Sequence, residues 1–151
     1  MLTKDGPKVI EYNCRFGDPE TQVVLPLLQS DLLTILQATV NGTLAETEVR
    51  FAQEAACCVV LASGGYPVSY QTGYPISGLA EAEKTAQVFH AGTRLQDHDV
   101  VTSGGRVLGV TAVAPTLAEA VAKAYAAAKV IKFEGRHIRH EIGKRALEAK
   151  A

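Results

Sequence analysis

The chain has 151 residues, which is enough for one modest domain with its own core or for two small subdomains. Its 15 Lys and Arg residues nearly balance 16 Asp and Glu residues, so the net charge is −1, and no basic run is present, which argues against nucleic acid or an anionic membrane as the main partner. No apolar run is long enough to span a bilayer, and the first residues lack the apolar core of a signal peptide, so we expect a cytoplasmic protein.

The first predicted element is an extended strand over Val9–Phe16, because apolar and polar residues alternate there. One face would carry Ile10, Tyr12, Cys14 and Phe16, and the other face would carry Glu11, Asn13 and Arg15. Side chains two apart on a strand lie roughly 6.6 Å apart along the chain, so the oxygens of Glu11 and Asn13 could reach one small hard cation such as Mg²⁺. Spacing alone favours the plainer interpretation, in which these residues form a solvated sheet face with a surface ion pair.

The strand should stop at Gly17, which permits a sharp change of direction. Asp18 is a good N-cap and Pro19 suits the first helical position, so a helix is predicted to begin at Pro19. The positive end of that helix would lie just beyond Arg15, where an anionic group such as a phosphate could be held.

The predicted helix continues over mostly apolar residues until Pro26 ends or kinks it. Ser30 or Asp31 should cap a second helix that ends at Asn41-Gly42. Its broad apolar face carries Leu32, Leu33, Ile35, Leu36 and Val40. The polar stretch that follows suggests a domain boundary, dividing the chain into residues 1–44 and 45–151.

The apolar run Glu54–Ala62 predicts a buried strand, broken by the turn Ser63–Pro67. Its adjacent cysteines, Cys57 and Cys58, would face opposite ways. The three cysteines contain no Cys-x-x-Cys pair, so we expect all of them, Cys14 included, to be buried reduced thiols; a redox role is the less favoured alternative.

The second half of the chain predicts a small, mostly antiparallel sheet. Strands are expected over residues 87–95 and 100–113, separated by the turn Gln96–Asp99, and a hairpin turn is expected at Gly104-Gly105. Thr116 and Glu119 form a capping box, which predicts a helix to about Val130, and a further helix is expected from Gly143 to Ala151. His137 and His140 lie three apart without a third ligand at a recognised spacing, so a solvated or ion-paired segment is the favoured interpretation.

The segment Glu11-Tyr-Asn-Cys-Arg-Phe-Gly-Asp-Pro-Glu-Thr-Gln22 resembles the signature of the glycinamide ribonucleotide synthetase family, also called phosphoribosylamine–glycine ligase. Four later motifs follow in the order usual for that family's C-terminal domain: Gly65-Tyr66-Pro67, His90–Thr93, Gly104–Leu108 and Phe133–Gly135. The resemblance implies an α/β (α+β) chain, with the C-terminal part of an ATP-grasp domain followed by a small antiparallel sheet domain with packed helices.

The same resemblance implies an ATP-dependent carbon–nitrogen ligase of purine biosynthesis, in which ATP, glycine and 5-phosphoribosylamine give glycinamide ribonucleotide, ADP and phosphate through a glycyl phosphate. Carried over by position, Glu11 and Asn13 would bind Mg²⁺ or Mn²⁺. Arg15 and Asp18 would be catalytic, and Arg15, Asp18 and Glu20 would contact substrate. The N-terminal part of the same enzyme is expected to be missing, so that the chain starts within a domain.

Two alternatives stay open at this stage. One is another ATP-grasp ligase of the purine pathway, such as a carboxylase-type enzyme, although Arg-Phe-Gly-Asp-Pro-Glu at residues 15–20 favours the glycine ligase. The other is a non-catalytic interaction or assembly domain derived from such an enzyme, which the shortness of the chain would suit.

Overall fold

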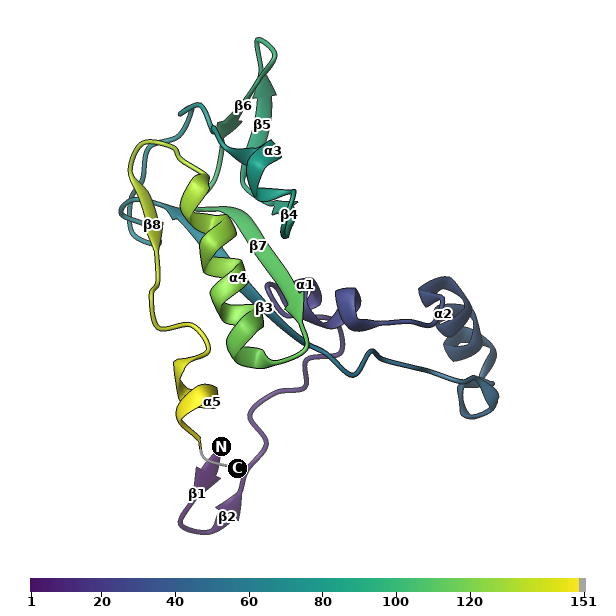
Figure 1. Ribbon diagram of the computed structural model, residues 1–151. Helices are drawn as coiled ribbons and strands as arrows, with labels where there is room; N and C mark the ends of the chain where they lie inside the picture. The colour runs from purple at the N-terminus through teal and green to yellow at the C-terminus, as the bar shows by residue number, and fades with distance from the viewer. Residues whose placement is uncertain (150–151) are drawn as a thin grey trace.

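A four-stranded antiparallel sheet, in the order β4-β7-β3-β8, forms the centre of the computed structural model, which describes residues 1–149 (Figure 1). Its strands are β4 Gln87–His90, β7 Arg106–Ala114, β3 Ala55–Ser63 and β8 Arg136–Ile138. The two long strands pair from Ala55 opposite Ala114 to Ala62 opposite Arg106, with an irregularity in register between Leu61 and Ala62. The predicted buried strand and the mixed α/β fold with a mostly antiparallel sheet are therefore confirmed.

The helix α4, Leu117–Val130, covers one face of this sheet and lies along β3 and β7 (Figure 1). It begins at the predicted capping box, in which the Thr116 side chain accepts from the Glu119 backbone N–H and the Glu119 carboxylate accepts from the Thr116 N–H. Four alanines of the helix join the buried cluster of the strands, where their small side chains allow close approach: Ala120, Ala124, Ala127 and Ala128. The strands contribute Cys57, Val59, Leu61, Leu108, Val110 and Ala112.

The opposite face of the sheet is only partly covered. Side chains alternate along a strand, so Cys58 and Val60 point away from the buried cluster, and both are half-buried. The short helix α1, Thr21–Val24, and the 3₁₀ turn η1, Leu25–Leu27, lie against this face of β3. Pro26 falls within η1, which confirms the predicted end of the first helix there.

The helix α2, Leu32–Asn41, stands away from the sheet (Figure 1). Its predicted ends are confirmed, because the Asp31 side chain accepts from the Thr34 N–H and Gly42 adopts the left-handed conformation at φ 73°. Its apolar face is only partly covered among residues 1–149: Leu32 and Ile35 are half-buried, whereas Val40 is 86% exposed and Leu33 is 62% exposed. The proposed boundary at residues 44/45 falls within the next turn, η2 Leu44–Glu46, and stays a prediction.

The predicted hairpin at Gly104-Gly105 is wrong. Instead β5, Thr93–Gln96, pairs with β6, Asp99–Thr102, in a separate two-stranded sheet that projects from the molecule (Figure 1). Its turn contains Asp97 and His98 at φ 47° and 76°, as a tight hairpin requires, and confirms the turn predicted at Gln96–Asp99. The single strand expected over residues 87–95 is divided into β4 and β5. The apolar β7 gains more by pairing in the buried sheet than it would beside β6.

The predicted strand over Val9–Phe16 is also absent, although a two-residue hairpin of β1, Leu2–Thr3, and β2, Gly6–Pro7, precedes it. Residues 8–16 are exposed and pair with no strand among residues 1–149, and an extended segment without a ladder partner has nothing to hold it as a strand. Cys14 is consequently exposed rather than buried. The first helix begins at Thr21, two residues beyond the predicted start at Pro19.

Two short helices complete the described residues. α3, Leu79–Ala82, packs beside α4, and α5, Lys144–Glu148, begins after Gly143 as predicted. Residues 150–151 of the predicted terminal helix lie outside the described residues. Within residues 1–149, none of the helices has both the length and the apolar character needed to cross a bilayer.

The alanine contact between α4 and the sheet generates the first prediction. Ala124 is fully buried, so Ala124→Leu should overpack the contact and lower the free energy of unfolding by about 1–3 kcal/mol. Ala122, on the exposed side of the same helix, provides the matched control, and Ala122→Leu should change stability by less than about 0.5 kcal/mol. Urea unfolding measures both, and equal losses in the two variants would contradict the observed packing.

Candidate functional site

The predicted metal ligands lie in an open segment. Glu11 and Asn13 are exposed, and neither side chain has a hydrogen-bond partner within residues 1–149. Arg15 is also exposed and donates to the Phe16 carbonyl at 3.2 Å. In the part of the chain that the structure describes, no three His, Cys, Asp or Glu side chains gather closely enough to hold a metal ion. Glu11 and Asn13 each present an exposed oxygen, the type of ligand that a hard cation prefers.

The turn that follows is closed by its own side chains. The Gly17 carbonyl accepts from the Thr21 N–H at 2.9 Å and from the Thr21 hydroxyl at 2.6 Å. The Glu20 carboxylate accepts from the Gly17 N–H at 3.1 Å. Gly17 and Glu20 thus bond across the turn, which we call the signature turn, residues 17–22.

Arg106 on β7 ties the signature turn to the sheet. Its Nη2 donates to Asp18 Oδ2 and its Nη1 to the Asp18 backbone carbonyl, both at 2.9 Å. The other carboxylate oxygen, Oδ1, accepts from Gln22 Nε2 at 2.9 Å. Because the ion pair is half-exposed, we expect it to add no more than about 1 kcal/mol to stability, so its main consequence is the geometry of the turn.

The backbone at Arg106 and at the preceding Gly105 is held by hydrogen bonds and close packing. Its carbonyl accepts from the Gly92 N–H at 2.8 Å, and the preceding Gly105 carbonyl accepts from the Ser63 N–H at 2.8 Å. A Cβ at Gly105 would lie only 2.1 Å from the Tyr66 ring, so a glycine is required where that ring packs. The loops that carry Gly92, Gly105 and Tyr66 therefore meet next to Arg106.

A fourth loop, which carries Gly135, also lies at this meeting point of the loops. Gly64 lies so close to the Gly135 carbonyl that an added Cβ would approach its oxygen to 2.7 Å. All four C-terminal motifs of the resemblance, together with the signature turn, thus converge at one end of β3 and β7. Sequence reasoning identified these motifs but not their meeting point, and it assigned no role to Arg106.

A groove of about 380 Å³ lies beside this convergence. Its floor is the open face of β3, with Cys58, Val60 and Ala62, and no carboxylate is among its lining residues. Three basic side chains line it: Arg106, His137 and Arg139. Two of these side chains, Arg106 and Arg139, are already paired with the carboxylates of Asp18 and Glu141. Burial raises the pKa of the Cys58 thiol.

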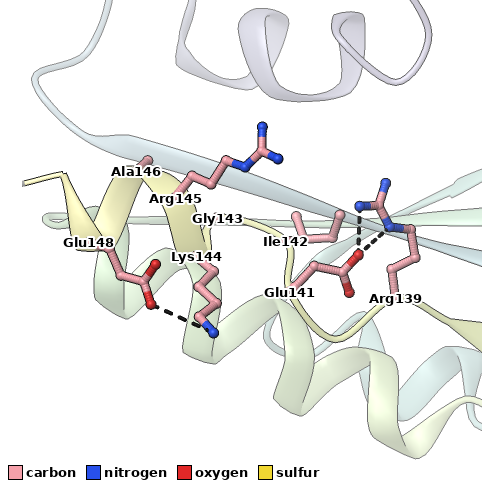
Figure 2. A pocket seen from close by; sticks show the side chains of 8 residues that line it. All are labelled: Arg139, Glu141, Ile142, Gly143, Lys144, Arg145, Ala146 and Glu148. Atoms are coloured by element: carbon pink, nitrogen blue, oxygen red, sulfur yellow. Dashed lines mark hydrogen bonds and ion pairs between the residues drawn. The ribbon is translucent and has the colours of Figure 1, made fainter.

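The neighbouring pocket in Figure 2 is built by the C-terminal segment and shares Arg139 with the groove. Arg139 pairs with Glu141 at 2.6 Å, which confirms the ion-paired interpretation of this segment and lowers the pKa of the Glu141 carboxyl. Lys144 pairs with Glu148 at 3.7 Å, whereas the Arg145 guanidinium extends away from that pair (Figure 2). The Tyr125 hydroxyl fastens the segment to α4 by donating to the Arg139 carbonyl at 2.7 Å.

Comparison with known proteins shows that two family models match parts of the chain. Residues 56–145 match the family described as phosphoribosylglycinamide synthetase, C domain. Residues 1–21 match the family described as phosphoribosylglycinamide synthetase, ATP-grasp (A) domain. The two matched ranges therefore follow one another along the chain, on either side of α2.

Individual relatives agree with these matches. The chain is 49% identical over 151 residues to a phosphoribosylamine–glycine ligase of Halalkalibacterium halodurans, and covers 35% of that protein. It is 50% identical over 149 residues to the trifunctional purine biosynthetic protein adenosine-3 of Homo sapiens, covering 97% of this chain and 15% of that one. The crystal structure of a phosphoribosylamine–glycine ligase from Thermotoga maritima matches with a TM-score of 0.74 and 34% identity, over 94% of this chain and 35% of that chain. The chain thus spans about a third of the length of these bacterial relatives.

The exposures of the cysteines generate the second prediction. Only the thiolate is a good nucleophile, and burial raises the pKa of both Cys57 and Cys58, so the exposed Cys14 should react first with iodoacetamide at pH 8. Mass spectrometry after short labelling should find the adduct on Cys14. The guanidinium-unfolded chain serves as the control, in which all three thiols should label alike. Equal labelling of the three in the folded chain would contradict this arrangement.

Proposed function

The chain belongs to the phosphoribosylglycinamide synthetase family, and from this membership we propose that it is part of an ATP-dependent ligase that joins glycine to 5-phosphoribosylamine. The product would be glycinamide ribonucleotide, in purine biosynthesis. The observation that carries the proposal is the match of 56–145 to the family's C domain, preceded by the match of 1–21 to its ATP-grasp domain.

In the proposed reaction, the glycine carboxylate accepts the γ-phosphoryl group of ATP, giving glycyl phosphate and ADP. The amine of phosphoribosylamine then attacks the glycyl carbonyl carbon, the C–N bond forms, and inorganic phosphate leaves. This chemistry depends on positioning and on neutralising phosphate charge more than on a covalent nucleophile.

We propose Glu11 and Asn13 as metal ligands, since both present exposed oxygens without hydrogen-bond partners in the described chain. A divalent cation, Mg²⁺ or Mn²⁺, would neutralise phosphate oxygens during the transfer. Arg15 is proposed to be catalytic and to hold a substrate phosphate, because a guanidinium can donate to two phosphate oxygens at once.

Asp18 and Glu20 are proposed to contact substrate, with Asp18 also in the catalytic set. Each carboxylate oxygen has more than one acceptor site, so the hydrogen bonds that Asp18 receives from Arg106 and Gln22 leave room for a substrate donor such as the ammonium group of glycine. The Glu20 carboxylate accepts from the Gly17 N–H through Oε2, so its other oxygen, Oε1, would accept from the substrate.

The decisive experiment measures ADP release from ATP, Mg²⁺, glycine and freshly generated phosphoribosylamine. The complete enzyme containing this chain should release ADP only when glycine is present. The isolated 151-residue chain should release none, because it spans about a third of the bacterial relatives and leaves Glu11 and Asn13 in solvent, where Mg²⁺ keeps its hydration shell. Dependence on another acceptor would favour a different ATP-grasp ligase of the purine pathway, and no ADP release from the complete enzyme would favour an interaction domain.

The third prediction concerns Glu11. In the complete enzyme, Glu11→Ala should abolish turnover at limiting Mg²⁺ without changing the melting temperature, because the side chain is exposed and makes no hydrogen bond in the described chain. Glu83→Ala is the matched control, since Glu83 is an exposed carboxylate at the end of α3. Normal turnover of Glu11→Ala under these conditions would remove Glu11 from the metal site.

The fourth prediction concerns Arg15. Arg15→Lys keeps the charge but loses the two-pronged donor, and loss of one charge-assisted contact of about 1.5–3 kcal/mol should reduce kcat/KM roughly tenfold to a hundredfold. Arg94→Lys, on the projecting β5 strand, should leave kcat/KM unchanged. Steady-state constants for Arg15→Lys equal to those of the parent would return Arg15 to a solvated surface role.

A further inference from the structure

We infer that Arg106 is a positioning residue for the ligase reaction, holding the signature turn so that the segment before it enters the site in one direction. This inference rests on the proposed function. Arg106 would act through Asp18 and the turn rather than by touching a substrate.

The first argument is the number and direction of its hydrogen bonds. The Arg106 guanidinium donates to both the carboxylate and the backbone carbonyl of Asp18, each at 2.9 Å. Bonding one residue at both its side chain and its main chain fixes orientation as well as distance, which a single ion pair would not do. These are contacts between residues 88 apart in the sequence, so local structure cannot replace them.

The second argument is the rigidity of the support. Arg106 opens the long strand β7, pairs with Ala62 on β3 and accepts from the Gly92 N–H. The adjacent Gly105 is held by the Ser63 N–H and by the close packing of the Tyr66 ring. A side chain on a backbone that is held in this way fixes the position of its hydrogen-bond partner relative to the sheet.

The third argument is that the described chain provides few other hydrogen bonds to hold the segment before the signature turn. Between Val9 and Phe16, the described chain makes no pairing with a strand, and its only recorded side-chain hydrogen bond is the local one from Arg15 to Phe16. Arg15 lies three residues before Asp18. Along the chain, Arg15, Asn13 and Glu11 therefore lie three, five and seven residues before Asp18, which Arg106 holds to the sheet.

The test uses the complete enzyme with Arg106→Ala, Arg106→Lys, Asp18→Ala and the double variant Asp18→Ala/Arg106→Ala. Arg106→Ala should lower kcat by about ten- to a hundredfold, which is the loss expected when a reacting group is misplaced. The KM values for ATP and glycine should stay within about twofold of those of the parent enzyme. Arg106→Lys should recover part of kcat, because it can still donate to one of the two acceptors. The loss in the double variant should be far smaller than the product of the single losses, because both changes break the same link. Arg94→Ala, whose guanidinium bonds Gln96 on the projecting hairpin, is the matched control.

Several outcomes would overturn the inference: an unchanged kcat in Arg106→Ala, single losses that multiply in the double variant, or a loss confined to KM. A fall in melting temperature that accounts for the lost activity would also overturn it, since Arg106 would then be a stability residue only. Failure of the proposed function looks different, because the parent enzyme itself would then show no glycine-dependent ADP release.

Discussion

The antiparallel pairing of β3 with β7 is the constraint on which the other features depend. Its register, with Val59 opposite Val110, decides which side chains meet the alanines of α4 and which face the signature turn. Because side chains alternate along a strand, a slip of β3 by one residue would turn its other face toward α4 and place Cys58 and Val60 in the core. The same pairing places Arg106 at the start of β7, beside Ala62 and within reach of Asp18.

Close approach of backbones is the second physical theme. Gly92 meets Gly104, Gly64 meets Gly135, and Gly105 receives the Tyr66 ring, each at a distance that a Cβ would not allow. These contacts bring loops that are far apart in the sequence to one end of the central strands. They explain why the motifs contain glycine there: the residue is needed for space, and the groups that we propose to be functional lie beside it on Arg106 and the signature turn.

The open parts of the molecule fit the proposed role as part of a larger ligase. Part of the apolar face of α2 (Leu33, Leu36 and Val40) and the apolar residues Ile10, Tyr12 and Phe16 are exposed in the described chain. The chain spans about a third of the length of its bacterial relatives. On the proposed function, the remaining groups around ATP would come from the rest of the ligase, and residues 9–16 would lie where the two parts meet.

The sequence by itself determined the elements whose signals are local. Each of these signals acts within a few residues and was predicted correctly: the capping box at Thr116, the helix end at Asn41-Gly42 and the apolar run of β3. The helix cap was predicted at Ser30 or Asp31, and the structure uses Asp31. The family and its mixed α/β fold were likewise predicted from short motifs in order. The roles of Glu11, Asn13, Arg15, Asp18 and Glu20 stay predictions, because they concern contacts with molecules outside the chain.

Only the tertiary structure decided the partners of the strands and of Arg106. An alternating pattern such as that of Val9–Phe16 states which side chains share a face but not whether a second strand is there to complete the hydrogen bonds, and so the predicted strand failed. The glycine pair at residues 104–105 permits a hairpin, yet β7 pairs with β3 and β4 because burial of its apolar residues outweighs the local turn signal. The link from Arg106 to Asp18 crosses 88 residues, a separation over which no local pattern carries information.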